Sequence, residues 1–340
     1  MAAYTGYLPV SQTSYLLESL FAQEKFAMLL ASGVLNSAPM DGALSKGDYV
    51  AIPTAIQADD FSVVDLTSEA AAGGTRATTN NQIAPIIRHY TQMTFAEHDN
   101  IRTQENWREL FSASAGNKLA KDVIVTLHRA LQGAMNVSGL NHLQDEGANA
   151  ITVGSIRKAK RLLGDQGHNV DTMLIHPDVW SDLFYDITTN YKYSGPMSGE
   201  WLANGAFESM FGVKNVIVSN DVAPIAAASS QYQGDQYYTW LFKSAPDVEA
   251  GEENLGGPVF FGYQAAPRFS EFVDTRVPST LTYVKWNTDY ALGIRGMAFS
   301  GGTTGSPTTA NLLNSSLWSQ ANSDDRQVGV VGIKSQGAQH

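Results

Sequence analysis

The sequence contains no cysteine. Without thiols the chain forms no disulfide bond, and a zinc site would have to use histidine and carboxylate ligands. The sequence also lacks an apolar run of about 18 residues, the length that a membrane-spanning helix needs, so no membrane partner is expected. Residues 1–7 show no basic group followed by an apolar run, as a signal peptide would. These absences predict a soluble chain that is made and used inside a cell.

The motifs of common catalytic and cofactor-binding sites are also missing. Glycine pairs occur at 73–74, 256–257 and 301–302, but none belongs to a G-x-x-x-x-G-K-[ST] or G-x-G-x-x-G motif. A phosphate-binding loop is therefore not supported, and no G-x-S-x-G motif marks a serine nucleophile. We predict no catalytic residue and no cofactor, and the chain is not expected to be an enzyme.

Acidic residues outnumber basic ones by 33 to 22, which gives a formal net charge of −11. A protein that reads a nucleic-acid sequence needs a basic surface to neutralise phosphates, so the charge argues against that class. Contact between one local face and packed nucleic acid is still compatible with it. The chain is 340 residues long and 43% hydrophobic, which is enough for a sizeable core divided over about two domains.

Histidines with neighbouring carboxylates form the densest group of potential metal ligands: His89, and His98 between Glu97 and Asp99. The separation between the two histidines fits neither a ligand pair on one helix face nor one on a strand face, so no metal site is predicted. His176 stands at the end of an expected strand, where a structural histidine is a better interpretation than a catalytic base.

Two further charged clusters each allow a functional interpretation and a purely structural one. The acidic cluster consists of Asp247, Glu249, Glu252 and Glu253. Its spacing lacks the alternate-residue oxygen ligands of an EF-hand, so a solvated acidic turn is the better interpretation. The basic cluster, on an expected helix, consists of Arg157, Lys158, Lys160 and Arg161. It could contact DNA, but a solvated or intersubunit face fits the pattern at least as well.

A segment between Pro53 and Asn100 is too long for a loop in a compact domain. It contains two strand-like pieces, 61–66 and 83–90, joined by a stretch rich in Gly, Thr and Asn. A single hairpin is only marginally stable in water, so we expect this extended loop to complete its burial on another subunit. The expected intersubunit contact is the loop tip, represented by Ser68, Glu69, Gly73, Gly74, Thr75 and Arg76.

A long helix is predicted next, because apolar residues recur in steps of three and four from Trp107 to Ala134. At ~1.5 Å per residue it spans roughly 40 Å, far more than a typical globular helix. A shorter helix is predicted at 14–32, ending at Gly33. Further helices are predicted at 152–163 and 177–183, and strands at 172–175, 213–219, 237–242, 259–263, 269–274, 281–286 and 290–299. This irregular mixture predicts an α+β fold.

The order of these elements resembles the major capsid protein of tailed bacteriophages, the Hong Kong 97-like fold. Met173–Leu183 is similar to the strand-turn-helix of that family's axial domain, and Trp286–Gly296 to the closing strand of its peripheral domain. The resemblance implies an N-terminal arm at 1–48, an extended loop at 49–106, the spine helix and peripheral domain at 107–149, an axial domain at 150–230, and mainly peripheral return strands with a C-terminal tail at 231–340.

The resemblance also implies a function and partners. Pentamers and hexamers of the chain would form the icosahedral head shell of a virion, assembled in the host cytoplasm around double-stranded DNA that is bound without sequence specificity. A separate scaffolding protein, a portal, and a cement or decoration protein would be its partners. Some members of the family cross-link subunits through a Lys on the extended loop. Residues 53–100 contain Arg76 and Arg88 but no Lys, so no covalent cross-link is expected.

Two alternatives remain at this point. Encapsulins share the same fold and form cellular nanocompartments that enclose cargo enzymes. A metal-dependent hydrolase is a more remote alternative, and it would need an ion bound at His89 or His98.

Overall fold

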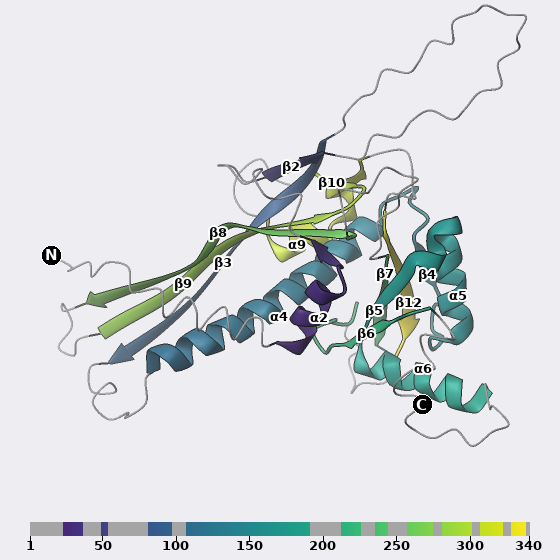
Figure 1. Ribbon diagram of the computed structural model, residues 1–340, viewed down its shortest axis with the longest axis horizontal. Coiled ribbons are helices and arrows are strands. Elements are labelled where there is room, and N and C mark those ends of the chain that lie inside the picture. Colours follow the sequence, from purple (N-terminus) through teal and green to yellow (C-terminus); the bar gives the residue numbers. More distant parts are fainter. Residues whose placement is uncertain are drawn as a thin grey trace, which may run out of the picture.

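The computed structural model describes residues 23–36, 49–53, 81–96, 107–190, 212–225, 235–243, 257–274, 281–300, 307–321 and 328–337. These residues form two five-stranded sheets, a two-stranded sheet and one dominant helix that runs between the larger sheets (Figure 1). None of the described helices is both long enough and apolar enough to cross a membrane.

Helix α4 (Trp107–Met135) confirms the long helix predicted from the apolar periodicity. Its buried apolar side chains follow one stripe, which consists of Phe111, Ala115, Leu119, Ala120, Val123, Ile124, Leu127, Ala130, Leu131, Ala134 and Met135. The stripe belongs to the largest apolar core of the chain. The helix predicted at 14–32 is described from its second half onward, as α2 (Glu24–Ala31). It is followed by Gly33, whose φ of 76° lies in the left-handed region that glycine adopts readily.

The first large sheet has the strand order β1-β8-β9-β3-β2. Its strands are β1 (Leu35–Asn36), β8 (Val259–Asp274), β9 (Leu281–Ile294), β3 (Asn81–Ala96) and β2 (Tyr49–Pro53). Along β9, side chains alternate between buried and half-exposed from 281 to 290, as expected for a strand with one face on a core. The buried face includes Trp286 and Tyr290, and the Tyr290 hydroxyl donates a 3.2 Å hydrogen bond to Thr126 of α4.

Strand β3 corrects part of the extended-loop prediction. The sequence predicted that 83–90 would belong to a free hairpin with 61–66 as the other strand. Instead, β3 pairs with β2 through residues 81–85 and with β9 through residues 86–96. Only 81–85 therefore belongs to the base of the hairpin, and the predicted strand 61–66 lies outside the described residues. The local sequence pattern predicts a strand but does not specify its pairing partner. The same pattern therefore fits a strand of a free hairpin and a strand paired with β9.

The second large sheet has the strand order β4-β12-β7-β5-β6. Its strands are β4 (Leu143–Asp145), β12 (Val330–Gln336), β7 (Gln236–Lys243), β5 (Val170–Ile175) and β6 (Asn215–Val218). One face, with Leu174, Trp240 and Phe242, shares a core with α4. The other face, with Met173 and Leu241, packs on α5 (Val153–Leu162) and α6 (Pro177–Asn190). The sheet is thus the middle of three layers.

The second sheet combines strands from three of the ranges predicted from the sequence. The range 150–230, predicted as the axial domain, contains only β5 and β6. The other three strands come from 107–149 and 231–340. Strand β12 lies in what was predicted to be a tail, although Val330, Val331 and Ile333 are fully buried. Its seven residues follow a polar stretch, which hid the strand signal.

Three further boundaries differ from prediction. Helix α6 continues to Asn190 rather than ending at Leu183. The strands predicted at 281–286 and 290–299 are instead the continuous β9 and a separate β10 (Met297–Phe299), divided by a turn where Gly296 has a φ of 80°. Strand β10 pairs with β11 (Trp318–Gln320). Helix α9 (Thr309–Leu313) and the 3-10 turn η3 (Ser315–Leu317) lie between these two strands in the sequence, and both contact α4.

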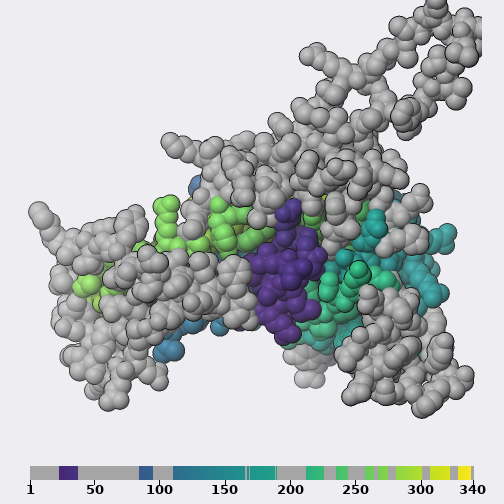
Figure 2. Space-filling model, in the orientation of Figure 1, coloured from purple at the N-terminus to yellow at the C-terminus, as the bar shows by residue number. Residues whose placement is uncertain are grey.

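Helix α2 lies at the surface where the two large sheets approach each other. Figure 2 shows it in purple between the green strands of the first sheet and the teal second-sheet unit. Gln23 Nε2 donates a 2.7 Å hydrogen bond to Asn117 Oδ1 of α4, and Lys25 Nζ lies 3.5 Å from Ser219 Oγ, just after β6. The N-terminal segment therefore contacts both structural units.

Candidate assembly surfaces

The extended loop is anchored at the edge of the first sheet. The register of β2 and β3 runs from Tyr49 opposite Pro85 to Pro53 opposite Asn81. The chain therefore leaves the sheet after Pro53 and returns at Asn81, at directly opposed positions. The predicted tip residues Ser68, Glu69, Gly73, Gly74, Thr75 and Arg76 lie between these anchors, outside the described residues.

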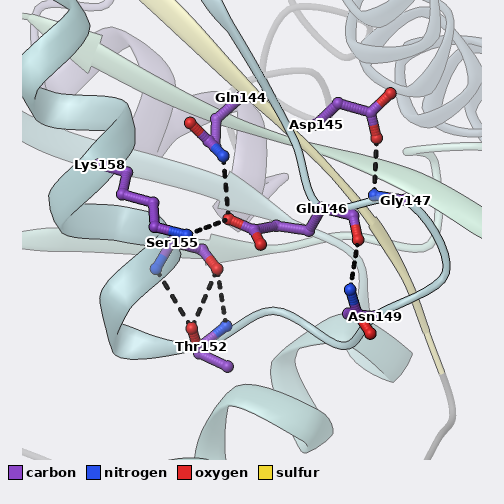
Figure 3. A network of polar contacts seen from close by, with 8 residues as sticks. All are labelled: Gln144, Asp145, Glu146, Gly147, Asn149, Thr152, Ser155 and Lys158. Atoms are coloured by element: carbon purple, nitrogen blue, oxygen red, sulfur yellow. Dashed lines mark hydrogen bonds and ion pairs between the residues drawn. The ribbon is translucent and has the colours of Figure 1, made fainter.

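Helix α5, which carries the basic cluster, begins at a well-defined cap. The backbone N–H of Ser155 donates to Thr152 Oγ1 at 3.2 Å, and the backbone N–H of Thr152 donates to Ser155 Oγ at 3.2 Å (Figure 3). This reciprocal pair satisfies N–H groups that a helix start leaves without partners. The N–H of Val153 donates to the Asp186 carboxylate of α6 at 3.0 Å. The cap thus fixes the direction of α5 relative to both α6 and the sheet beneath.

A carboxylate in the turn after β4 forms an ion pair with one basic residue of α5. Glu146 forms a 3.7 Å ion pair with Lys158 and accepts a 3.1 Å hydrogen bond from Gln144 (Figure 3). The neighbouring Asp145 accepts from the N–H of Gly147 at 2.7 Å and pairs with Lys334 at 3.2 Å. Both carboxylates of this turn are therefore engaged within the subunit.

Some residues of the basic cluster have a partner for their positive charge among the described residues, and others have none. Lys160 is half-buried, and its Nζ donates a 3.2 Å hydrogen bond to the Val170 carbonyl. Burial lowers the pKa of Lys160, while the nearby Asp171 carboxylate acts in the opposite direction. Arg157 and Arg161 are exposed and stand four residues apart on α5, so they share one helix face. Within the described ranges neither has an ion-pair partner.

The junction between α4 and the second sheet is built around His128, which is fully buried. Trp240 of β7 donates from its indole N–H to His128 Nδ1 at 2.8 Å. His128 Nε2 lies 3.0 Å from the carbonyl oxygen of Ala223, to which it donates. Asn136, the residue after α4, donates to the Tyr238 hydroxyl at 3.0 Å. Burial lowers the pKa of His128 to about 4, so the ring is neutral at pH 7.

The histidines considered as metal ligands have other partners. His89 stacks on Tyr290, with ring centroids 5.2 Å apart, and its Nδ1 lies 3.7 Å from the Asp122 carboxylate. Burial lowers the pKa of His89, against the raising effect of Asp122. His98, Glu97 and Asp99 lie outside the described residues. Among the residues that the structure describes, no three His or carboxylate side chains gather at a potential metal position.

His176 has the surroundings predicted for a structural histidine. Its ring stacks on Tyr237 with centroids 4.2 Å apart, and its Nδ1 accepts a 3.2 Å hydrogen bond from the N–H of Asp178. The acidic cluster Asp247, Glu249, Glu252 and Glu253 lies outside the described residues.

Sequence reasoning missed the buried junction at His128. The available signal was a histidine next to Leu127, among the apolar positions of the long helix. The partner that explains it, Trp240, is 112 positions away, and nothing in the local pattern connects the two.

Comparison with known proteins identifies solved structures with a similar fold. No protein-family model matches the sequence, and no curated protein matches it. Solved structures do match over nearly the whole chain. The capsid of Ralstonia phage GP4 is 10% identical, covering 89% of this chain and 86% of its own, with a TM-score of 0.54. The Cyanophage Pam1 capsid is 13% identical, covering 88% of each chain, with a TM-score of 0.52.

A structure from Mycobacterium phage Adephagia is 8% identical, covers 91% of this chain and 89% of its own, and has a TM-score of 0.50. At such low identities these matches concern the backbone arrangement alone. The chain therefore has the α+β fold of bacteriophage capsid proteins, the Hong Kong 97-like fold predicted from its sequence.

Proposed function

We propose that this chain is the major capsid protein of a tailed bacteriophage, a self-assembling subunit of the head shell. The observation that carries the proposal is the match to phage capsid structures over nearly the full length of both chains. The paired anchors Pro53 and Asn81 support it, because they stand at opposed positions of β2 and β3, where an extended loop would begin and end.

The mechanism is geometric. Heterologous contacts repeated around an axis close into rings, and pentamers and hexamers of one chain close into an icosahedral shell. In this proposal the arm at 1–48 packs beneath one neighbour, and the loop between its anchors lies across another. Helix α4 supplies a stiff connection between the two sheets, since both share its buried stripe. Each contact can be weak because every subunit is held by many at once.

The proposal extends to partners and location. The shell encloses double-stranded DNA, held without sequence specificity, and forms in the host cytoplasm as part of a virion. A separate scaffolding protein guides closure, a portal occupies one vertex, and a cement protein strengthens the outside.

A nanocompartment shell of the encapsulin type is the alternative, since it uses the same fold. The discriminating observation is what copurifies with the particles: DNA and portal protein for a phage head, or a cargo enzyme for a nanocompartment. A metal-dependent hydrolase is the remote alternative, and it requires an ion bound at His89 or His98.

The test is negative-stain electron microscopy of the purified chain at increasing concentration, combined with sedimentation analysis. Rings of five or six copies, or closed shells, are expected. A chain that remains a single monomeric species at every concentration, with and without a coexpressed scaffolding protein, overturns the proposal.

A further inference from the structure

Strand β3 has one long edge that is not occupied by another strand. Its residues 81–85 pair with β2 on this side. Residues 86–96 pair with β9 on the opposite side, and among the described strands none continues the sheet beyond them. An open strand edge presents N–H and C=O groups that can bind another strand. The stretch 89–94 is therefore a place where the sheet can be extended.

Both faces of the sheet are exposed along this edge. Successive side chains of a strand point to opposite faces, and His89 points toward α4, where its Nδ1 lies 3.7 Å from the Asp122 carboxylate. Met93 lies on the same face as His89 and is 40% exposed, and Tyr90 lies on the other face and is 72% exposed. At these two positions no element in the described part of the chain covers the sheet, so a further strand has room on both faces.

The sequence of this edge lacks the features that keep strand edges from pairing. Natural edge strands are protected by charged residues, proline or β-bulges. The other long edge of the sheet, in β8, has all three: Pro267, the charged Arg268 and Glu271, and two shifts in its register with β9 between residues 263 and 268. Residues 89–94 contain no Lys, Arg, Asp, Glu, Pro or Gly, and their register with β9 is continuous. Of the two edges, that of β3 is the one suited to bind a strand.

The chemistry of the edge fits a second copy of the same edge. In an antiparallel pair about a two-fold axis at Thr91, this residue stands opposite its own copy, and the two form a favourable Thr–Thr cross-strand pair. Tyr90 then stands opposite Gln92 of the other copy, and His89 stands opposite Met93. Like charges directly opposite each other destabilise a strand pair, and in this register no Lys, Arg, Asp or Glu of 89–93 faces another. The edge is therefore complementary to itself.

We propose that β3 of one copy pairs antiparallel with β3 of a second copy through residues 89–93, about a two-fold axis at Thr91. The contact rests on the proposed shell function, because an icosahedral shell contains two-fold axes, and a contact on such an axis is isologous. It joins copies of neighbouring rings, whereas the heterologous contacts close each ring. A strand pair this short buries less than the roughly 800 Å² per partner of a stable interface. The unassembled chain therefore pairs transiently, and the shell maintains the pair through its other contacts.

Single cysteines test the contact, because the chain has none of its own. Thr91→Cys places two thiols opposite each other, with Cβ atoms about 4.5–5.5 Å apart before adjustment, against about 3.5–4.5 Å in a disulfide. The matched control is Thr94→Cys, an exposed threonine of the same strand, whose two copies would be displaced by roughly 20 Å along the strands.

Under mild oxidation of the concentrated chain, Thr91→Cys should form a disulfide-linked dimer at least about tenfold faster than Thr94→Cys, since only the residue at the axis meets disulfide geometry. Non-reducing gel electrophoresis measures both rates. A smaller difference between the two rates, or no dimer from Thr91→Cys, overturns the proposal.

A charge at the axis tests the contact in assembly. Thr91→Lys places two like charges opposite each other, so it should lower the yield of shells at least about tenfold while rings of five or six still form. The controls are Thr91→Ser, which keeps a hydroxyl at the axis, and Thr94→Lys, which adds the same charge away from it. Both should assemble as the original chain does. Normal shells from Thr91→Lys, or an equal loss with Thr94→Lys, overturn the proposal.

The outcomes separate this contact from the proposed function. A Thr91→Cys dimer from a chain that never forms rings or shells upholds the strand pair while the shell function fails. Shells from a chain whose Thr91→Cys variant forms no dimer overturn the strand pair and leave the shell function intact.

Discussion

The indole N–H of Trp240 donates a 2.8 Å hydrogen bond to His128 Nδ1, which joins the middle of the second sheet to the long helix. The bond requires an unprotonated Nδ1. The Nε2–H of the same ring donates to the Ala223 carbonyl oxygen at 3.0 Å. One tautomer of a neutral histidine therefore connects three segments. Protonation of Nδ1 would remove the acceptor and place a charge in an apolar core.

The stability of the subunit should fall as the pH drops from about 6.5 to about 4. Burial lowers the folded-state pKa of His128 from 6.5 to about 4, so the unfolded chain binds this proton first as the pH falls. The contribution is complete above pH 6.5 and is lost progressively toward pH 4, for a total of roughly 3 kcal/mol of unfolding free energy. Urea unfolding of the unassembled subunit at a series of pH values measures it.

The matched variant is His128→Gln, which removes the titrating group. It should be less stable at pH 7, because the Trp240 N–H loses its partner, yet its stability should change less between pH 6.5 and 4. If both chains show the same pH dependence over this window, the buried neutral ring is not its cause.

Gly133→Ala should destabilise the subunit. A Cβ at Gly133 would overlap the Leu312 carbonyl oxygen and lie 2.7 Å from Trp318 Nε1, two atoms that already share a 2.8 Å hydrogen bond. Overpacking of this kind costs about 1–3 kcal/mol or more, here because α4 and α9 must separate. Thermal unfolding of the unassembled subunit should show a lower melting temperature.

Gly154→Ala is the control for Gly133→Ala. Gly154 also lies in a helix, but its added Cβ would have Thr152 Oγ1, at 3.4 Å, as its nearest neighbour. Alanine should then stabilise α5 by up to about 1 kcal/mol through helix propensity. Equal effects of the two substitutions would show that packing against α9 is not limiting.

Removal of residues 68–80 should separate folding from assembly. The paired strands β2 and β3 hold the loop anchors independently of its tip, so the shortened chain should keep a cooperative melting transition close to that of the full chain. Shell formation should be lost in electron micrographs. Shells of normal size from the shortened chain would contradict an intersubunit role for Ser68, Gly73 and Arg76.

Mature particles should contain no covalent bonds between chains. Residues 53–100 offer Arg76 and Arg88 but no Lys, and a guanidinium stays protonated in proteins, so it cannot act as the nucleophile for an isopeptide bond. The absence of cysteine excludes disulfides. Boiling purified particles in detergent should release one band near 36.7 kDa. A ladder of covalent dimers to hexamers would refute the prediction.

Local patterns in the sequence predicted local structure well. Helix α4 was predicted nearly residue by residue, because a 3.6-residue period over 29 residues is a strong signal contained in the segment itself. The end of α2 just before Gly33 and the start of α6 at Pro177 were predicted for the same reason. Each depends only on neighbouring residues.

The pairing between distant segments could not be predicted from such local patterns. The apolar alternation of β3 predicted a strand, but not that 86–96 would pair with β9 rather than with the rest of a hairpin. At the candidate surface, the basic pattern of α5 was visible from sequence. Which of these basic residues have a partner within the subunit was not visible, because the fold of the second sheet places the partners Glu146 and Val170.

The position of β12 has a consequence for the order of events during synthesis. Until residues 330–336 have left the ribosome, β7 lacks its neighbour on one side. At about 5–20 residues per second, the interval after Lys243 lasts roughly 5–20 s. Through that time the nascent chain exposes an open strand edge, which can capture a strand of another chain. Translation past residue 336 supplies β12, which covers this edge of β7, so a chain truncated before residue 330 would keep the edge open.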